Sequence, residues 1–172
     1  LMFEVDNVAN VLSSVLDAPG ASTLLFLPIA HVLGRVIQCV IVQRRALLAH
    51  SPDLKNLVPD LQSFHPTLLL AVPRVFERVY NGAEQKAQAD GKGKIFALAV
   101  AVAQDYSRSL DTGGPGLVLR LKHAIFDHLV YGKLRAAVGG NVQWAVSGGA
   151  PLGERLGHFF RGVGITILEG YG

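Results

Sequence analysis

Short apolar runs alternate with segments of helical periodicity along this chain, and this alternation constrains the fold more than any other feature. The runs have the length of buried strands, or alternate apolar and polar residues as half-buried strands do. Strands that alternate with helices favour a parallel sheet with helices packed on its faces. We therefore expect an α/β fold, with a largely parallel sheet, helices on both faces, and strands at 24–27, 67–72, 142–146 and 165–168.

The segments between the strands carry residues that begin and end helices. Ser51 and Pro52 resemble an N-cap followed by proline at the first helical position, and Pro73 begins a further helix. Gly162 and Gly164 are typical of a helix end. Turns are expected at 85–94 and 111–116. Helices are expected at 31–44, from Pro73 to Tyr80, at 95–110 and at 152–160. Two further helices are expected, one after Ser51 with an apolar face of Leu54, Leu57, Val58 and Leu61, and one marked by Leu117, Leu121, Ala124, Ile125 and Leu129.

The composition limits the class of protein. A chain of 172 residues is about one domain long, and half of its residues are hydrophobic, which excludes a disordered tail. Lys and Arg number 16 against 13 Asp and Glu, a mild excess that permits an anionic ligand or lipid surface without requiring either. Basic residues do not cluster with aromatic residues, so we expect no nucleic-acid partner.

The single cysteine and the longest apolar stretch bear on the compartment. Cys39 excludes an internal disulfide and favours a reducing compartment, and its apolar neighbours predict a buried thiol. The stretch 21–42 is interrupted by Pro28, His31 and Arg35, which is unlike a membrane span. We expect a cytoplasmic protein, for which peripheral contact with a membrane stays open.

Parallel sheets bind ligands at the carboxyl ends of their strands. In this chain the rule selects three places, at 28–31, 147–151 and 169–172. The spacing of His123 and His128 does not suit a shared helical face, and no zinc-ligand spacing occurs. We therefore expect no metal ligands in this chain.

The second of these places has an unusually bare backbone. Gly148, Gly149 and Ala150 let a flat ring or a phosphate approach closely, and Pro151 suits the first turn of the helix that follows. A plain strand-to-helix turn is the alternative. Ala145 occupies the position where a nucleophile elbow needs glycine, and no phosphate-loop motif occurs elsewhere in the chain.

The other two places carry one aromatic, one acidic and one titratable side chain. Tyr171 lies between Gly170 and Gly172, so its ring can stack on a base, and Glu169 can accept a hydrogen bond from an exocyclic amine. A tyrosine that packs over a turn is the alternative. His31 can contact a carboxylate or gate a cleft, and a helix-start histidine bonded to backbone is the alternative there.

Four segments of the chain stand in a characteristic order. They are Phe-Leu-Pro-Ile-Ala-His-Val at 26–32, Ala-Val-Pro-Arg-Val-Phe-Glu-Arg-Val-Tyr at 71–80, Ser-Gly-Gly-Ala-Pro-Leu at 147–152 and Glu-Gly-Tyr-Gly at 169–172. The set resembles the long-chain fatty acyl-CoA synthetases of the adenylate-forming superfamily, whose adenine loop the third segment matches. The second segment favours this branch over luciferases and peptide-synthetase adenylation domains.

The resemblance implies a two-step reaction that uses ATP, Mg²⁺ and coenzyme A. A fatty acid carboxylate attacks the α-phosphate of ATP and gives acyl-adenylate and pyrophosphate. The thiol of coenzyme A then displaces AMP and gives the thioester. Mg²⁺ supports the first step by neutralising phosphate charge. The implied partners are small molecules: a long-chain fatty acid, ATP and coenzyme A.

The resemblance also implies roles for individual residues. His31 matches a histidine near the acyl carboxylate and the thiol path, and Val32 and Arg35 would border the acyl channel. Arg35 occupies the position of a gating tryptophan in one type of family member, so no such gate is expected. No catalytic residue is implied within the chain. The implied nucleotide-binding residues are Gly148, Gly149, Ala150, Pro151, Glu169, Gly170, Tyr171 and Gly172.

Compared with this family, the chain is expected to be a single incomplete domain, 1–172, from the AMP-binding domain of a larger enzyme. The phosphate loop, the Thr-Glu pair after Gly172, the ribose-binding aspartate and the C-terminal lid with its lysine all lie outside it. Because these groups hold the triphosphate, we expect the chain alone to be inactive. A fatty acyl-AMP ligase that stops at the adenylate and a non-catalytic fold fragment or interaction module are the alternatives.

Overall fold

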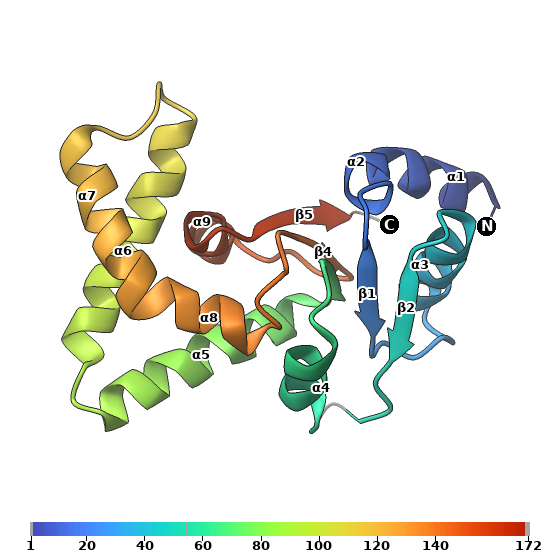
Figure 1. Cartoon of the computed structure of the whole chain (residues 1–172), viewed down its shortest axis with the longest axis horizontal. Helices are drawn as coiled ribbons and strands as arrows, with labels where there is room; N and C mark the ends of the chain where they lie inside the picture. The colour runs from blue at the N-terminus through green and yellow to red at the C-terminus, as the bar shows by residue number, and fades with distance from the viewer. Residues whose placement is uncertain (1, 54, 171–172) are drawn as a thin grey trace.

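The computed structural model describes residues 2–53 and 55–170, and within them the chain has one five-stranded parallel sheet. The strand order is β2-β1-β3-β4-β5, and helices cover both faces of the sheet (Figure 1). The predicted α/β fold is therefore confirmed. The strands are β1 (Ser22–Leu25), β2 (Leu47–His50), β3 (Leu68–Ala71), β4 (Trp144–Gly148) and β5 (Thr166–Gly170).

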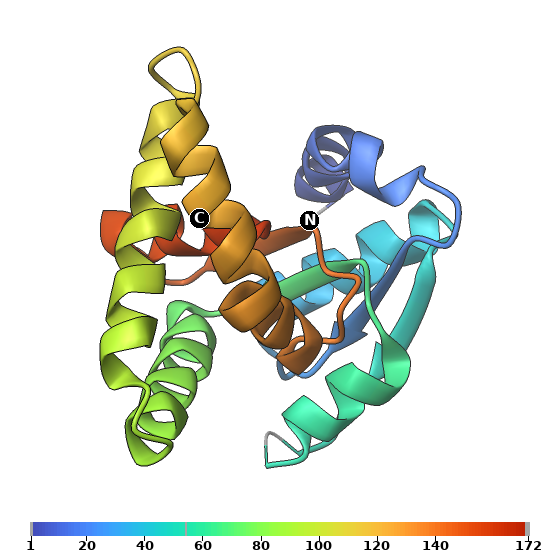
Figure 2. The same ribbon diagram turned by 60° about the vertical axis from the view of Figure 1, so that its left-hand side comes forward.

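Two groups of helices lie on opposite faces of the sheet (Figures 1 and 2). Because successive strand residues point to opposite faces, Leu25 and Leu70 pack with the first group, and Leu24 and Leu69 with the second. The first group is α1 (Met2–Val11), α2 (Ser13–Leu16) and α3 (Val32–Gln43). The second group is α4 (Leu57–Phe64), α5 (Pro73–Ala89), α6 (Gly93–Leu110), α7 (Leu117–Phe126), the π-helical turn η1 (Asp127–Tyr131), α8 (Gly132–Ala137) and α9 (Glu154–Val163).

The core beneath the second group is rich in rings, and we call it the aromatic core. The centroid of the Phe159 ring lies 5.1 Å from Tyr80, 5.2 Å from Phe160 and 6.5 Å from Phe96. The near-perpendicular pairs have the edge-to-face geometry that ring quadrupoles favour. The buried Tyr131 hydroxyl donates to the carbonyl of residue 99 at 2.6 Å, and burial raises the pKa of this phenol. The aromatic core is thus held by directional contacts.

Among the described residues, the buried side chains of the core beneath the first group are all aliphatic, and we call it the aliphatic core. Within the described part of the chain, its buried members are Val5, Ala9, Leu12, Val15, Leu16, Leu25, Val36, Ile37, Val40, Ile41, Leu68, Leu70 and Val146. Cys39 packs at the margin of this core and is half-buried, so the prediction of a buried thiol is wrong in degree. The buried face of α3 is formed by neighbouring residues instead.

Ser51 and Pro52 do not begin a helix, because α4 begins later, at Leu57. The Ser51 N–H donates to the Leu25 carbonyl at 3.0 Å and so continues the ladder between β2 and β1. The buried Ser51 hydroxyl donates to the carboxylate of Asp60 at 2.5 Å. Ser51 therefore links the end of β2 to α4 through a side-chain hydrogen bond, although its sequence context resembles a helix N-cap.

The sequence did not predict β2, α1 and α2. Strand β2 is at the edge of the sheet and its end residues are exposed, so its short apolar run carries little periodicity. Helix α5 continues to Ala89, and residues 90–92 connect it to α6, so the predicted turn at 85–94 is mostly helical. The polar residues there belong to the exposed face of a long helix. Leu54, predicted on a helical face, lies outside the described residues.

The two glycines predicted to end the helix after β4 have different roles. Gly164 ends α9 in the left-handed conformation, with φ of 98°, as predicted. Gly162 lies inside α9, where a Cβ atom would overlap the carbonyl of Ala103 in α6. This glycine therefore allows two helices to approach more closely than any side chain would permit.

Helix α7 was predicted from apolar residues, and the structure exposes them. Leu117 is 84% exposed and Leu121 is 65% exposed. The helix is held instead through His123, whose ring stacks on Tyr106 at 3.8 Å and whose Nε2 bonds the Gly162 carbonyl at 2.6 Å. Within the described residues, no helix is long and apolar enough to cross a bilayer.

Candidate functional site

Two of the predicted ligand-binding segments end neighbouring strands. Strands β4 and β5 are parallel and pair in register, with Ser147 opposite Glu169 and Gly148 opposite Gly170. Their carboxyl ends therefore lie side by side at one edge of the sheet. The segment 28–31 follows the carboxyl end of β1 at the same edge. The fold thus brings the three predicted segments to one side of the molecule.

The backbone is bare where β4 ends. A Cβ atom on the buried Gly148 would lie 2.7 Å from Cδ2 of Leu33, so α3 packs directly on the strand. Gly149 is exposed and has φ of 86°, a conformation that favours glycine. The nearest atom to a Cβ at Gly149 would be Cγ1 of Val72, 4.0 Å away. The peptide at Gly149 therefore presents an open backbone surface that a flat group can approach.

The loop after Gly149 is longer than predicted. Pro151 was expected in the first turn of a helix, but α9 begins only at Glu154, after Gly153 with φ of 86°. Gly149 and Gly153 both have positive φ, and residues 151–153 form an irregular segment before the helix. Ala150 and Pro151 are exposed in this loop.

His31 is the N-cap of α3. Its extended backbone (φ −79°, ψ 131°) precedes the helix, and its Nδ1 accepts a hydrogen bond from the Leu33 N–H at 3.3 Å. This is the backbone-bonded histidine that the alternative interpretation predicted, and it leaves Nε2 outside the cap. Val32 and Arg35 are exposed in the first turn. Because Leu33 contacts Gly148, this helix start lies beside the end of β4.

The last predicted segment is only partly within the described residues. Glu169 and Gly170 are exposed at the end of β5. Tyr171 and Gly172 lie outside the described residues, so a ring stacked on a base stays a prediction. Ser147, opposite Glu169, is 1% exposed, and its Oγ finds no hydrogen-bond partner among the described residues. Buried hydroxyls are usually bonded, so we expect a water or ligand group at this oxygen.

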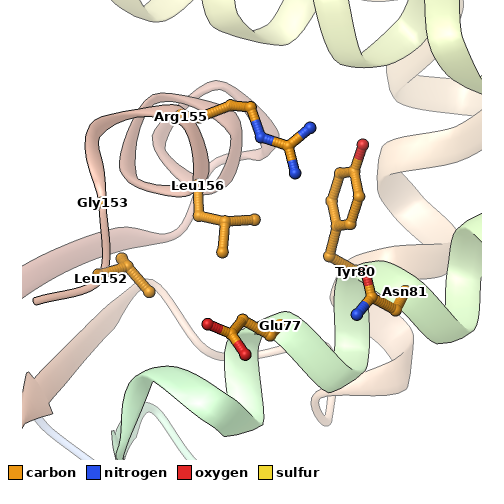
Figure 3. A pocket seen from close by; sticks show the side chains of 7 residues that line it. All are labelled: Glu77, Tyr80, Asn81, Leu152, Gly153, Arg155 and Leu156. Atoms are coloured by element: carbon orange, nitrogen blue, oxygen red, sulfur yellow. The ribbon is translucent and has the colours of Figure 1, made fainter. Parts of the chain in front are cut away.

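A pocket of 370 Å³ adjoins the loop after β4, and the sequence analysis missed it (Figure 3). The Arg155 guanidinium lies 5.2 Å from the centre of the Tyr80 ring, a cation–π arrangement. The carboxylate of Glu77 lines the same pocket. Only tertiary packing brings α5 and α9 together here, so no local pattern could have revealed it. The lining residues are Glu77, Tyr80, Asn81, Leu152, Gly153, Arg155 and Leu156.

Charged side chains do not form a metal centre in the described part of the chain. No group of three or more His, Cys, Asp or Glu residues is placed there to hold a metal ion. The strand ends instead offer open backbone at Gly149 and exposed polar side chains to a flat or anionic group.

The chain is similar to long-chain acyl-CoA ligases over most of its length. It is 59% identical over 153 residues to the long-chain-fatty-acid–CoA ligase FadD15 of Mycobacterium tuberculosis, covering 89% of this chain and 26% of that protein. It is 36% identical over 153 residues to long chain acyl-CoA synthetase 4 of Arabidopsis thaliana, covering 87% of this chain and 22% of that protein. The chain thus spans about a quarter of the length of these relatives.

Solved structures share the fold. The A-PCP didomain of carboxylic acid reductase from Segniliparus rugosus, in complex with AMP, matches with a TM-score of 0.66 and 23% identity, over 98% of this chain and 20% of that chain. The A domain of that reductase, in complex with AMP and a co-purified carboxylic acid, matches with a TM-score of 0.60 and 24% identity, over 87% of this chain and 20% of that chain. Residues 2–172 match the family described as AMP-binding enzyme, and the chain belongs to that family.

Proposed function

We propose that the protein carrying this chain is a long-chain fatty acid–CoA ligase that forms an acyl-adenylate from ATP and then the acyl-CoA thioester. One observation carries the proposal: the open, glycine-bearing end of β4 lies in register beside the Glu-Gly end of β5. An adenine ring needs a flat, accessible backbone of this kind. The ligases to which the chain is similar supply the reaction class.

In this proposal the nucleotide is held by backbone at two strand ends. Gly148 keeps α3 close, and Gly149, Ala150 and Pro151 provide the exposed surface for adenine. Glu169 accepts a hydrogen bond from the adenine amine. Gly170, Tyr171 and Gly172 complete the binding segment, with the tyrosine ring stacked on the base.

The acyl group and the thiol of coenzyme A approach from the start of α3. His31 is fixed by its cap to Leu33, which leaves Nε2 to face the reacting carboxylate. Val32 and Arg35, exposed in the same turn, border the acyl channel. A cation at Arg35 also suits an anionic substrate.

The chain provides one part of this enzyme. We propose that residues 1–172 are an incomplete AMP-binding domain and that they are inactive alone, because groups that bind the phosphates and Mg²⁺ come from other parts of the complete protein. Mg²⁺ supplies charge neutralisation at the phosphates. The substrates are small molecules, and the proposed location is the cytoplasm with peripheral contact at a membrane.

The test is an assay of the complete protein with palmitate, ATP and Mg²⁺, with and without coenzyme A. We expect AMP release and palmitoyl-CoA only when coenzyme A is present. Palmitoyl-adenylate that accumulates without conversion to thioester would identify a fatty acyl-AMP ligase. Lack of palmitate-dependent turnover, and of turnover with other long-chain acids, would remove the proposal.

A glycine substitution tests the adenine surface. In Gly149→Ala, a Cβ projects from the exposed strand end, so we expect the KM for ATP to rise at least tenfold. Gly140→Ala is the matched control, because Gly140 is also exposed and has φ of 82°, and among the described residues only its chain neighbours come within 4 Å of the place that a Cβ would take. Equal effects of the two substitutions on the KM for ATP would show that Gly149 acts only through backbone strain.

A further inference from the structure

The outer face of α7 is an apolar surface without a partner in the described part of the chain. Leu117, Val118, Leu121 and Ile125 are exposed by 84%, 70%, 65% and 51%. Leu129 in η1, 50% exposed, continues the same row at a spacing of four residues. Large apolar side chains that form one continuous row indicate an interaction surface.

The orientation of α7 makes this row the most outward part of the helix. Leu119, His123 and Phe126 are its half-buried residues, and His123 bonds the Gly162 carbonyl of α9. With about 100° of rotation per residue, Leu117 and Leu121 lie on the opposite side of the helix. The helix is therefore anchored by its inner face, and its apolar row points away from the sheet.

Two cations flank the apolar row. Arg120 and Lys122 are exposed on either side of Leu121, and neither forms an ion pair among the described residues. Helices with an apolar row between exposed cations are typical of proteins that lie in the interface of an anionic membrane.

The formal net charge of the chain falls within the segment that contains α6, α7 and α8. Residues 93–137 hold six of the Lys and Arg residues and three Asp, so they account for the entire formal excess of +3. The three aspartates are each paired with an arginine, in Asp105–Arg108, Asp111–Arg161 and Asp127–Arg135. The acidic groups near α7 are thus neutralised, whereas Arg120 and Lys122 remain available to an anionic partner.

The α6–α7 hairpin is placed to reach a flat surface. Figures 1 and 2 show it extending away from the sheet, with its connecting loop at the tip. A shallow hollow of 430 Å³ at the start of α7 is lined by Gly116, Leu117, Val118, Leu119 and Lys122. The tip therefore adds apolar surface next to a lysine.

We propose that the outer face of α7 binds the surface of an anionic lipid bilayer. The apolar row enters the boundary between headgroups and acyl chains, while Arg120 and Lys122 contact lipid phosphates. A second copy of the chain fits less well, since a symmetric contact would bring the same cations together. The inference rests on the proposed function, because a long-chain fatty acid is itself apolar and partitions into a bilayer.

Vesicle binding of the complete protein tests this surface without ATP. The probes are phosphatidylcholine vesicles with and without phosphatidylglycerol, and co-sedimentation gives the partition coefficient. We expect binding to the anionic vesicles that weakens about fivefold for each cation removed in Arg120→Gln and Lys122→Gln. Leu117→Gln with Leu121→Gln should reduce binding at least tenfold.

Exposed residues elsewhere give matched controls. Leu47→Gln removes a leucine that is 62% exposed on strand β2, and Lys55→Gln removes an exposed cation before α4. Both should bind vesicles as the wild-type protein does. Adenylate formation from detergent-dispersed palmitate should be unchanged in every variant, so loss of ligase activity and loss of membrane binding are separate results.

Three results would overturn the inference. One is equal affinity of the α7 variants and the wild-type protein for anionic vesicles. Another is a concentration-dependent dimer that Leu117→Gln with Leu121→Gln dissociates, which would make a second copy the occupant. The third is protection of α7 from hydrogen exchange in the complete protein without lipid, beyond that of α6, which would mean that another part of the protein covers the face.

Discussion

The two faces of the sheet are covered by helices that are held in different ways. On one face, the aliphatic core packs α1 to α3 through Val, Leu, Ile and Ala residues. On the other, the aromatic core adds ring pairs and buried hydrogen bonds, such as Tyr131 to residue 99 and His123 to residue 162. Apolar burial stabilises both faces, and on the aromatic face the ring pairs add a dependence on the angle between neighbouring rings.

Each face also has an arginine that ties helix ends together. Arg44, after α3, donates to the Ala9 carbonyl at 2.9 Å and pairs with Asp17 at 3.2 Å. Arg135, in α8, donates to the Val163 carbonyl at 2.8 Å and pairs with Asp127 at 2.7 Å. The Arg135 contact fixes the end of α9 just before β5, which carries a proposed nucleotide segment. On the aliphatic face, the site depends instead on α3, which carries His31 and packs against Gly148 through Leu33.

The largest expected difference between the two cores is the loss of unfolding free energy when one residue of each is replaced by leucine. Phe159→Leu removes ring contacts to three neighbours, each worth about 0.5–1.5 kcal/mol beyond burial, so we expect a loss of roughly 2–4 kcal/mol. Ile37→Leu in the aliphatic core conserves volume and should cost less than about 1.5 kcal/mol. Urea unfolding followed by circular dichroism measures both. Equal losses would mean that the rings contribute only through their area.

The next largest expected loss of stability comes from the close contact between α6 and α9 on the aromatic face. Gly162→Ala places a methyl group against the Ala103 carbonyl, so α9 must move from α6, at a cost of about 1–3 kcal/mol. Gly157→Ala is the control in the same helix, because no described residue outside that helix turn lies within 4 Å of its Cβ position. That change should stabilise by up to about 1 kcal/mol through helix propensity. Similar melting temperatures for both variants would contradict the close contact.

On both faces of the sheet, the sequence could predict elements with regular periodicity but not the contacts between elements. Strands β3 and β5 and helices α3 and α6 follow from local periodicity, since their apolar residues repeat as the elements require. The role of Gly162 does not, because a glycine near a helix end has the same local pattern whether it caps the helix or contacts another helix. The prediction that Ser51 caps a helix was wrong for a similar reason, because its N–H donates to the Leu25 carbonyl of a neighbouring strand.

In the candidate site, too, some residues could be predicted from local sequence and others only from tertiary packing. The glycines after β4 and the histidine before α3 could be selected because strand ends and helix starts have sequence signatures. The pocket of Tyr80 and Arg155 could not, because residues 75 positions apart meet there only through packing of α5 and α9. The exposure of Leu121 was equally hidden, since the periodicity that predicts a helix does not say which face is buried.

The smallest expected effect concerns the ion pair on the aromatic face and its dependence on pH. Hydrogen bonds from Arg135 hold the pKa of Asp127 below its ordinary value, against the opposite effect of burial. Because the pKa is lower in the folded protein, the ion pair stabilises the fold above about pH 4, the aspartate pKa in unfolded chains. This stabilisation is lost as the pH falls through the folded-state pKa.

Asp127→Asn should therefore lower the free energy of unfolding at neutral pH by less than about 1 kcal/mol, because both side chains are partly exposed to solvent. The difference between the variant and the wild-type protein should shrink below about pH 4, where the carboxylate becomes protonated. Asp17→Asn, on the aliphatic face, is the control for loss of a carboxylate that pairs with an arginine. Urea unfolding at a series of pH values measures all three proteins. A difference at Asp127 that stays constant down to pH values near 2 would mean that shape rather than charge joins Asp127 to Arg135.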